Sequence, residues 1–329
     1  LINNLGYKFC TNDEKEIEKY IDGNYKPTAN KGKIIESSNL VEKYVNFLCK
    51  EVGCDLKGIN IAVDTAYGSN YLLAEKVFKK LNASVVIINN QPKGEMINVN
   101  CGALNVNKLK YEVMLHQCEF GFAFDGDADR LIVVLKDGRV LNGDDILFVL
   151  GGYMLNNNKL NSLTVVGTIM TNKGTEESFK KLGVNLVRTD VGDRNVIEKM
   201  MQNNYVLGGE SSGHICVSSL NTTCDALLNA LFLLKIVITE NIDLSELLLH
   251  LTKVKQTTVN VKVTDEFRHG FDVNLKLKKD IAHIQKHYQD MRIVVRPSGT
   301  ESVIRIMVEG DESMAKEVIE KIKTLLVTV

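Results

Sequence analysis

The chain of 329 residues is longer than one average domain, which predicts two to four compact units. Hydrophobic residues make up 44% of the chain and charged residues 25%, a composition typical of globular proteins. The formal net charge of −1 argues against binding to nucleic acid or to an anionic membrane surface, and no apolar stretch reaches the ~20 residues of a membrane span.

The seven cysteines include no Cys-x-x-Cys pair. Such an odd, unpatterned set favours a reducing cytosol over a disulfide framework or a zinc site, and no secretory signal peptide is visible. We therefore predict a cytoplasmic protein without a disulfide framework. The chain begins with Leu1 rather than Met, so we expect further sequence to precede it.

The first half of the chain changes from two isolated helices to a βαβ rhythm. Helical spacing of apolar residues predicts helices over 13–21 and 37–51, and the second opens on serines suited to N-capping. Beyond residue 53 we predict strands at 59–63, 84–88, 120–124 and 131–135, with helices at 70–81 and 107–117. Alternating strands and helices predict a parallel sheet.

A second unit of the same kind spans roughly 144–255. The predicted strands are 163–167, 184–188 and 205–209, and the predicted helices are 144–155, 174–181, 193–203 and 223–238. From about 256 the pattern changes to strands at 257–263, 292–296 and 302–308 with helices at 279–289 and 312–326. We therefore expect successive three-layer α/β domains with mixed sheets, followed by a small C-terminal α+β domain.

An aspartate-rich loop follows the apolar strand 120–124, in the stretch "GFAFDGDADR". Asp125, Asp127 and Asp129 alternate with small residues, so an extended backbone can present all three carboxylates to one ion. Mg²⁺ prefers such hard oxygen ligands. The alternatives are a solvated acidic turn and an EF-hand, but the EF-hand's glycine and its final glutamate are missing. The pattern favours a divalent metal site.

Two further loops carry groups suited to a phosphorylated sugar. In "VLGGESSGHI", Glu210 and Ser212 can hydrogen-bond vicinal hydroxyls and His214 can act beside them, unless this is only a Gly/Ser turn. In "VVRPSGTES", Arg296 precedes a Pro-Ser-Gly-Thr turn whose backbone amides can bind phosphate, unless it is an ordinary hairpin turn. A polar loop with two arginines, "RTDVGDRNV", also ends a predicted strand.

Taken together, these loops resemble those of the α-D-phosphohexomutase superfamily, in which four domains each give one loop to a central cleft. The superfamily's metal, sugar and phosphate loops match Asp125–Arg130, Gly209–His214 and Arg296–Glu301. The segments "NVNCGALN", "RTDVGDR" and "TVNVKV" look most like those of bacterial phosphoglucosamine mutases. Ser211 stands where bacterial phosphomannomutase/phosphoglucomutases commonly carry Met, and a small polar residue suits a 2-amino group.

The resemblance implies a reaction and a set of site residues. The reaction is the interconversion of glucosamine 6-phosphate and glucosamine 1-phosphate through a phosphoserine and glucosamine 1,6-bisphosphate, on the route to amino-sugar nucleotides. Mg²⁺ would lie on the three aspartates, with Arg130 as the catalytic residue that braces the transferring group. The implied substrate-binding residues are Arg188, Asp193, Arg194, Glu210, Ser211, Ser212, His214, Arg296, Ser298, Gly299, Thr300 and Arg305.

The family's nucleophile lies in a Ser-x-His-Asn-Pro loop, and the three prolines here follow Lys26, Gln91 and Arg296. Because no such loop occurs, we expect the chain as given to bind but not to catalyse. The segment "NNLGYKF" looks like the one that follows this loop. The implied domains are a remnant of domain 1 at 1–52, a metal-loop domain at 53–143, a sugar-loop domain at 144–255 and a phosphate-loop domain at 256–329.

Two other functions stay open at this point. One is a mutase of the same superfamily that acts on mannose or glucose phosphates. The other is a sugar-phosphate-binding protein without turnover. In each case the partner is a small phosphosugar, not nucleic acid or a membrane, and a homo-oligomer is compatible with the sequence.

Overall fold

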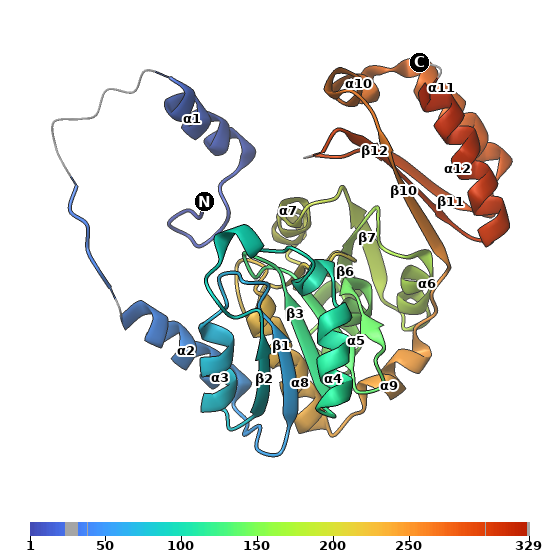
Figure 1. Ribbon diagram of the computed structural model, residues 1–329. Coiled ribbons are helices and arrows are strands. Elements are labelled where there is room, and N and C mark those ends of the chain that lie inside the picture. The colour runs from blue at the N-terminus through green and yellow to red at the C-terminus, as the bar shows by residue number, and fades with distance from the viewer. Residues whose placement is uncertain (24–31, 38, 300, 328–329) are drawn as a thin grey trace.

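The computed structural model describes residues 1–23, 32–37, 39–299 and 301–327 (Figure 1). The N-terminal part contains helices α1 (Thr11–Asp22) and α2 (Asn39–Val52). Val45, Leu48 and Val52 form the buried stripe of α2, at the spacing of one face of a helix. Through this stripe α2 packs against α3 (Leu73–Lys80) and α8 (Ala226–Glu240).

The metal-loop region is built on a five-stranded mixed sheet in the order β2-β1-β3-β4-β5. Its strands are β1 (Asn60–Asp64), β2 (Ser84–Ile88), β3 (Phe120–Phe124), β4 (Leu131–Leu135) and β5 (Val140–Leu141), with helices α3 (Leu73–Lys80) and α4 (Asn107–Leu115). The first three strands are parallel, whereas β4 and β5 are antiparallel to their neighbours. The prediction of mixed sheets is confirmed.

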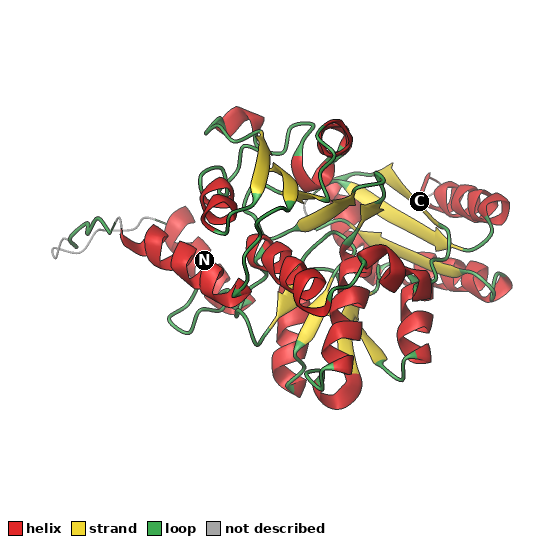
Figure 2. Ribbon diagram, turned by 90° about the horizontal axis from the view of Figure 1, so that it is seen from below, coloured by secondary structure: helices red, strands yellow, loops and turns green. Residues whose placement is uncertain are grey.

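The next region has a four-stranded sheet in the order β7-β6-β8-β9. The strands are β6 (Thr164–Thr168), β7 (Asn185–Thr189), β8 (Leu207–Gly209) and β9 (Ile215–Val217). The helices are α5 (Gly143–Asn156), α6 (Lys173–Lys181), α7 (Asp193–Asn203), α8 (Ala226–Glu240) and α9 (Leu244–Leu247). Figure 2 shows helices flanking the strands. Because α8 also packs under β3 and β4, the two α/β regions share one hydrophobic core.

The C-terminal region has its own core and an antiparallel sheet in the order β10-β12-β11. It comprises β10 (Gln256–Lys262), β11 (Arg292–Pro297), β12 (Val303–Glu309), α10 (Asp265–Gly270), α11 (Leu275–His287) and α12 (Glu312–Val327). In Figure 1 it stands to one side of the shared core and continues from the segment that follows α9. The predicted fold class, α/β regions followed by a small α+β region, is confirmed.

The expectation about the cysteines is wrong in one respect. Cys216 and Cys224 form a disulfide, with eight residues of sequence separation and 4.6 Å between their Cα atoms. The pairing has no sequence pattern because it depends on the tertiary approach of β9 to the segment before α8. Cys10, Cys49, Cys54, Cys101 and Cys118 are free thiols.

None of the helices in the described part of the chain is long and apolar enough to cross a membrane. This agrees with the hydropathy of the sequence.

One buried carboxyl at the start of α5 predicts a pH-dependent stability. Burial raises the pKa of Asp144 from 3.8 to about 6, although its carboxylate accepts a hydrogen bond from the Asn172 amide. A raised pKa in the folded state stabilises the fold below the unfolded value, and this contribution is lost as the pH rises through the folded value. The native protein should therefore lose about 3 kcal/mol relative to Asp144→Asn between about pH 4 and about pH 7. Urea unfolding of both proteins measures this; parallel pH profiles would contradict it.

Candidate active site

The metal loop, residues 125–130, connects the antiparallel strands β3 and β4. Ala128 adopts a left-handed backbone conformation with φ of 63°, which turns the chain between the second and third aspartates. The amide of Ser69 donates to the Gly126 carbonyl at 2.8 Å, and the amide of Ala226 donates to the Ala128 carbonyl at 3.0 Å. The loop is therefore held from both sides, by the turn after β1 and by the start of α8.

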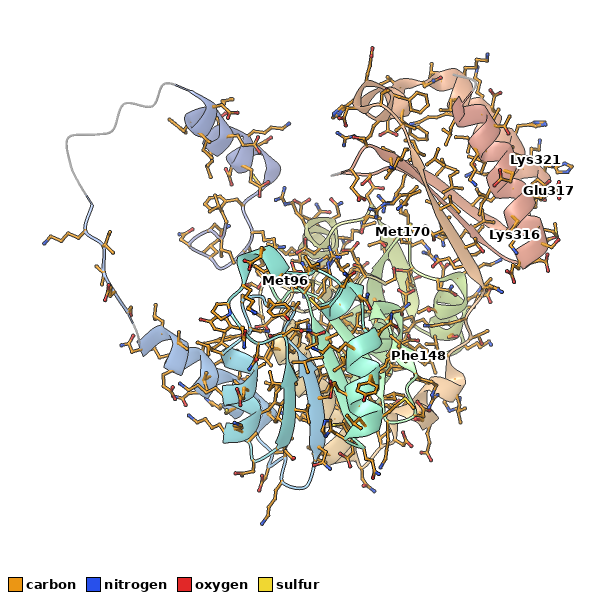
Figure 3. All side chains as sticks on the ribbon, in the orientation of Figure 1. Met96, Phe148, Met170, Lys316, Glu317 and Lys321 are labelled. Carbon is orange, nitrogen blue, oxygen red and sulfur yellow. A yellow bond between two sulfur atoms is a disulfide. The ribbon has the colours of Figure 1, made fainter. Side chains whose placement is uncertain are left out.

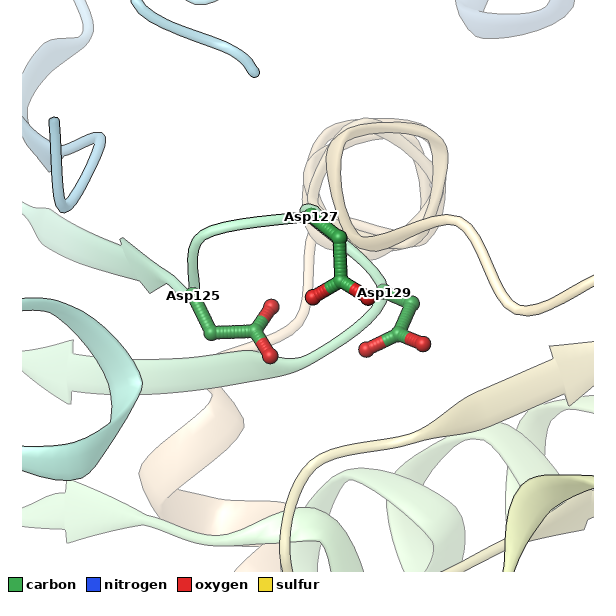
Figure 4. Close-up of side chains that lie close together, drawn as sticks. All are labelled: Asp125, Asp127 and Asp129. Carbon is green, nitrogen blue, oxygen red and sulfur yellow. The ribbon is translucent and has the colours of Figure 1, made fainter. Parts of the chain in front are cut away.

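The three predicted metal ligands gather around one point. Carboxylate oxygens of Asp125, Asp127 and Asp129 lie within 4.8 Å of one another, and Figure 4 shows them on one loop. Burial, and after it the neighbouring Asp129 charge, raise the pKa of Asp125 to about 6. Hard oxygen donors with excess negative charge fit a divalent cation such as Mg²⁺.

Arg130 lies directly behind these carboxylates, as predicted. Its amide donates to Asp125 at 3.1 Å, and its Nε lies 3.4 Å from the other oxygen of the same carboxylate. The guanidinium is only partly exposed. It therefore adds positive charge at the edge of the anionic cluster.

His214 connects the metal loop to the sugar loop, residues 209–214. Its Nε2 lies 3.1 Å from Asp129 Oδ1 and its Nδ1 lies 2.7 Å from Glu210 Oε2. Burial disfavours the charged ring, but the two carboxylates outweigh burial and raise the pKa of His214 to about 9. Arg130 Nε also lies 3.2 Å from His214 Nε2, so this ring nitrogen faces both a carboxylate and a guanidinium, while Nδ1 faces Glu210.

Backbone hydrogen bonds also hold the sugar loop against β4 and α5. The amide of Leu131 donates to the Gly213 carbonyl at 3.0 Å, and the amide of Gly143 donates to the Ser211 carbonyl at 3.1 Å. Gly213 has φ of +105°, and a Cβ on Gly143 would lie 1.8 Å from the Glu210 carbonyl oxygen. Only glycine fits this contact, so the sugar loop is seated on β4 and on the start of α5.

The predicted sugar-binding side chains differ in their exposure and in how many hydrogen bonds they already make within the protein. Glu210 is buried; besides His214, it accepts a hydrogen bond from the Gly192 amide at 2.9 Å. Ser212 is exposed with its Oγ 3.4 Å from His214 Nδ1, and Ser211 is partly buried. Ser212 and Ser211 are therefore the accessible polar side chains of this loop.

The loop 188–194 is divided between the site and the protein interior. Arg188 donates to the carbonyls of Thr168 and Thr171 at 2.8 and 2.7 Å and pairs with Glu176. Asp193 contacts Lys8, and Arg194 pairs with Glu14. Arg188 thus stabilises the turn after β6, and contact of these three residues with a substrate stays a prediction.

The phosphate loop, residues 296–301, begins at the end of β11, and its Arg296 faces Arg305 of β12. Arg296 and Arg305 are directly opposite in the β11–β12 pair, and the Nε atom of each is buried without a hydrogen-bond partner. Burial and the neighbouring Arg305 lower the pKa of Arg296, partly offset by Glu210 and Asp190. Like charges directly opposite on a sheet are destabilising. Glu301 pairs with Arg305 at 2.7 Å, and an anion bound between the two guanidinium groups would relieve the remaining repulsion.

The remaining phosphate-loop residues are partly described. Ser298 is buried, and the carbonyls of Ser298 and Gly299 accept hydrogen bonds from Arg268 Nη1 at 3.0 and 3.2 Å. Thr300 lies outside the described residues. Among the described residues no hydrogen bond joins this loop to the metal or sugar loops, but Glu210 and Asp190 are near enough to act on the charge of Arg296.

Sequence reasoning missed two residues at the site. Lys8 lies 3.4 Å from Asp129 and also contacts Asp193, and these carboxylates outweigh burial and raise its pKa. Arg268, from α10, supports the phosphate loop. The segment "NNLGYKF", which contains Lys8, carries no motif of its own beyond its likeness to the family, and α10 is too short to give a helical pattern.

Comparisons with known proteins agree with this arrangement. Family models named phosphoglucomutase/phosphomannomutase match as α/β/α domain II at residues 42–138, α/β/α domain III at 142–254 and the C-terminal domain at 259–324. The chain is 37% identical to the phosphoglucosamine mutase of Finegoldia magna, covering 97% of this chain and 73% of that protein. It is 39% identical to the phosphoglucosamine mutase of Fusobacterium nucleatum, covering 98% and 72%.

Solved structures show the same fold at lower identity. A phosphoglucomutase/phosphomannomutase family protein from Burkholderia thailandensis superposes with a TM-score of 0.77 at 20% identity, covering 97% of this chain and 70% of that one. The Aspergillus fumigatus N-acetylphosphoglucosamine mutase in complex with GlcNAc-6P and magnesium gives 0.68 at 20% identity, covering 87% and 70%.

Proposed function

Since the chain belongs to the phosphoglucomutase/phosphomannomutase family of the α-D-phosphohexomutase superfamily, we propose that it interconverts glucosamine 6-phosphate and glucosamine 1-phosphate. One observation carries the proposal: His214 contacts both Asp129 of the aspartate cluster and Glu210 of the sugar loop, so the candidate metal site and the candidate sugar site are adjacent. Relatives at 37–39% identity over nearly the whole chain are phosphoglucosamine mutases, which supports the amino sugar over other hexoses.

Asp125, Asp127 and Asp129 would hold Mg²⁺, which when bound neutralises charge on the phosphoryl oxygens. Arg130 and Lys8 add positive charge around the same carboxylates, so a dianionic phosphate is attracted to this end of the site. Their role is to orient the phosphoryl group, since phosphoryl transfer depends largely on positioning and charge stabilisation.

Transfer in the proposed reaction passes through glucosamine 1,6-bisphosphate. The phosphoryl group of an enzyme phosphoserine moves to the free sugar hydroxyl, whose proton is released, and the other sugar phosphate then returns a phosphoryl group to the serine. The proposal assigns this serine to the family's Ser-x-His-Asn-Pro loop, which the 329 residues do not contain. Turnover is therefore measured on a polypeptide that carries the loop.

The sugar and the second phosphate would be held by separate loops. Glu210 retains acceptor capacity beside its two internal partners, and Ser212 is exposed for a hydroxyl. At the other end, Arg296 and Arg305 would bind the phosphate that is not reacting, together with Ser298, Gly299 and Thr300. Because the two ends of the substrate exchange roles, each loop must accept either orientation.

Selectivity for the amino sugar should depend on Ser211. We expect Ser211→Met to lower the preference for glucosamine 6-phosphate over glucose 6-phosphate by roughly 10- to 200-fold, since a thioether removes a polar contact and fills space near C2. The ratio of dissociation constants, measured by calorimetry, tests this. Ser219→Met, at an exposed position beyond β9, is the control and should keep the ratio. An unchanged ratio in Ser211→Met would remove this residue from the specificity argument.

A substrate panel tests the function itself. Glucosamine, glucose and mannose 6-phosphates are compared with coupled detection of each 1-phosphate. The proposal predicts the highest kcat/KM for glucosamine 6-phosphate. Faster conversion of glucose or mannose phosphate would instead assign the chain to the phosphoglucomutase/phosphomannomutase activity.

We also propose a cytoplasmic location, because a charged phosphosugar does not cross a bilayer unaided. Because Cys216 and Cys224 are buried, alkylation of thiols in cells lysed directly into denaturant and alkylating reagent tests this location. A reducing cytosol predicts that both are alkylated, whereas a fully oxidised pair, as in the structure, would indicate an oxidising compartment.

A further inference from the structure

The phosphate loop lies at one end of the β11–β12 hairpin, and a buried ion pair lies at the other end. Arg292 begins β11 and faces Glu309, which ends β12, while the phosphate loop, residues 296–301, begins at the other end of β11. At the usual rise along a strand, five residues separate the two ends by about 17 Å. Figure 1 shows this hairpin crossing from the side of α6 toward α7.

The ion pair is fastened to the turn 169–173 between β6 and α6. Arg292 Nη1 lies 3.0 Å from Glu309 Oε2 and 3.2 Å from the Thr171 carbonyl, and Nη2 contacts the Ile169 carbonyl. The Lys173 amide donates to both Glu309 carboxylate oxygens at 3.2 and 3.3 Å. The Gln256 side-chain amide also donates to Glu309 Oε1 at 3.3 Å. The Glu309 side chain has no exposed surface, so protein groups take the place of water around it.

The same turn is rigidly connected to the sugar loop. Asn172 accepts from the Val254 amide and donates to its carbonyl, and its own amide donates to Asp144 in α5. The first residue of α5, Gly143, donates to the Ser211 carbonyl. Met170, which lies in the same turn and is labelled in Figure 3, accepts a hydrogen bond on its carbonyl from the side-chain amide of Gln256 in β10. The base of the hairpin and the sugar loop therefore share one frame of hydrogen bonds.

A contact of this kind determines orientation more than stability. Exchanging a buried ion pair for apolar residues is often neutral for stability, because the desolvation cost offsets the attraction, whereas removing one partner destabilises the fold by leaving a charge unpaired. The tip of the hairpin makes no hydrogen bond to the metal or sugar loops among the described residues, so its placement depends on the base. A tilt of about 10° at the base would displace the tip by about 3 Å.

We propose that Arg292 and Glu309 are positioning residues that hold the phosphate loop at the distance where one phosphosugar reaches both it and the metal and sugar loops. This inference rests on the proposed function, because a two-ended substrate is what requires a fixed separation. Loss of the base contact leaves each loop intact. A substrate already bound at the sugar loop would then meet the phosphate loop less often, because the effective concentration of the phosphate loop near the substrate's free end falls.

The test compares a ligand that spans the site with one that does not. In Glu309→Gln, we expect the affinity for glucosamine 6-phosphate to fall about tenfold while the affinity for inorganic phosphate, which needs only the phosphate loop, stays within about twofold. Hydrogen exchange at the Lys173 amide should quicken in the same variant. Tyr288→Phe, which removes the hydrogen bond to Glu317 inside the C-terminal region, is the control and should change neither affinity.

Two outcomes would overturn the proposal. An equal loss of affinity for phosphate and phosphosugar would show that the substitution disturbs the phosphate loop itself. Unchanged phosphosugar affinity together with faster hydrogen exchange at the Lys173 amide would show that loosening the Glu309 contact does not affect substrate binding. Failure of the proposed function is separate: it appears in the unsubstituted protein as no preference for glucosamine 6-phosphate over glucose 6-phosphate, and glucose 6-phosphate then serves as the spanning ligand.

Discussion

Replacing Asp127 with Asn should lower the Mg²⁺ affinity on the order of 100-fold, because one negative charge beside a divalent cation is worth a few kcal/mol at a partly exposed site. Asp127 is the exposed member of the cluster, so its loss removes no buried contact. Removing one of three mutually repelling charges should leave the fold at least as stable. Isothermal titration with Mg²⁺ and thermal unfolding measure the two quantities.

Asp137→Asn provides the matched control for Asp127→Asn. Asp137 is an exposed aspartate in the turn after β4, paired with Arg139 and outside the cluster. Its substitution should not change Mg²⁺ affinity. If Asp127→Asn and Asp137→Asn bind Mg²⁺ equally well, the loop after β3 is not the metal site.

The second large effect concerns the two facing arginines. Arg296→Gln should weaken phosphosugar binding roughly 10- to 150-fold, because a charge-assisted hydrogen bond is worth about 1.5–3 kcal/mol. The same change should not lower the free energy of unfolding, since it removes the repulsion with Arg305. If the site binds an anion, Arg296→Gln should therefore weaken binding without lowering the free energy of unfolding.

Calorimetric titration with glucosamine 6-phosphate and urea unfolding test this pair of effects. Arg139→Gln, at an exposed arginine distant in sequence from the phosphate loop, should leave binding unchanged. If Arg296→Gln binds normally but unfolds more easily, the arginine has a structural role and the phosphate is held elsewhere.

Much of this site could be predicted from local sequence. The apolar strand 120–124 and the alternating aspartates fixed the metal loop at a strand end, because period-two alternation and side-chain chemistry are both local properties. Arg296 was placed before a turn for the same reason. Most strands and helices could be predicted from hydrophobic periodicity, which depends only on neighbouring residues, but the short elements β5, β9, α9 and α10 could not.

The contacts between distant segments could not be predicted in this way. The position of Lys8 beside Asp129 joins residues 121 apart in sequence, and Cys216 meets Cys224 only because β9 turns back toward α8. Arg188 was expected in the site, but its hydrogen bonds to the turn after β6 depend on the parallel pairing of β6 with β7. Such approaches are set by tertiary packing.

The central claim is that these loops serve the interconversion of glucosamine phosphates. The most direct measurement is ³¹P NMR of glucosamine 6-phosphate incubated with Mg²⁺, a trace of glucosamine 1,6-bisphosphate and a polypeptide that joins these residues to the Ser-x-His-Asn-Pro loop. The account predicts that a glucosamine 1-phosphate signal grows in proportion to protein concentration and that Asp127→Asn abolishes it. No 1-phosphate from glucosamine 6-phosphate, under conditions in which glucose or mannose 6-phosphate is converted, would contradict it.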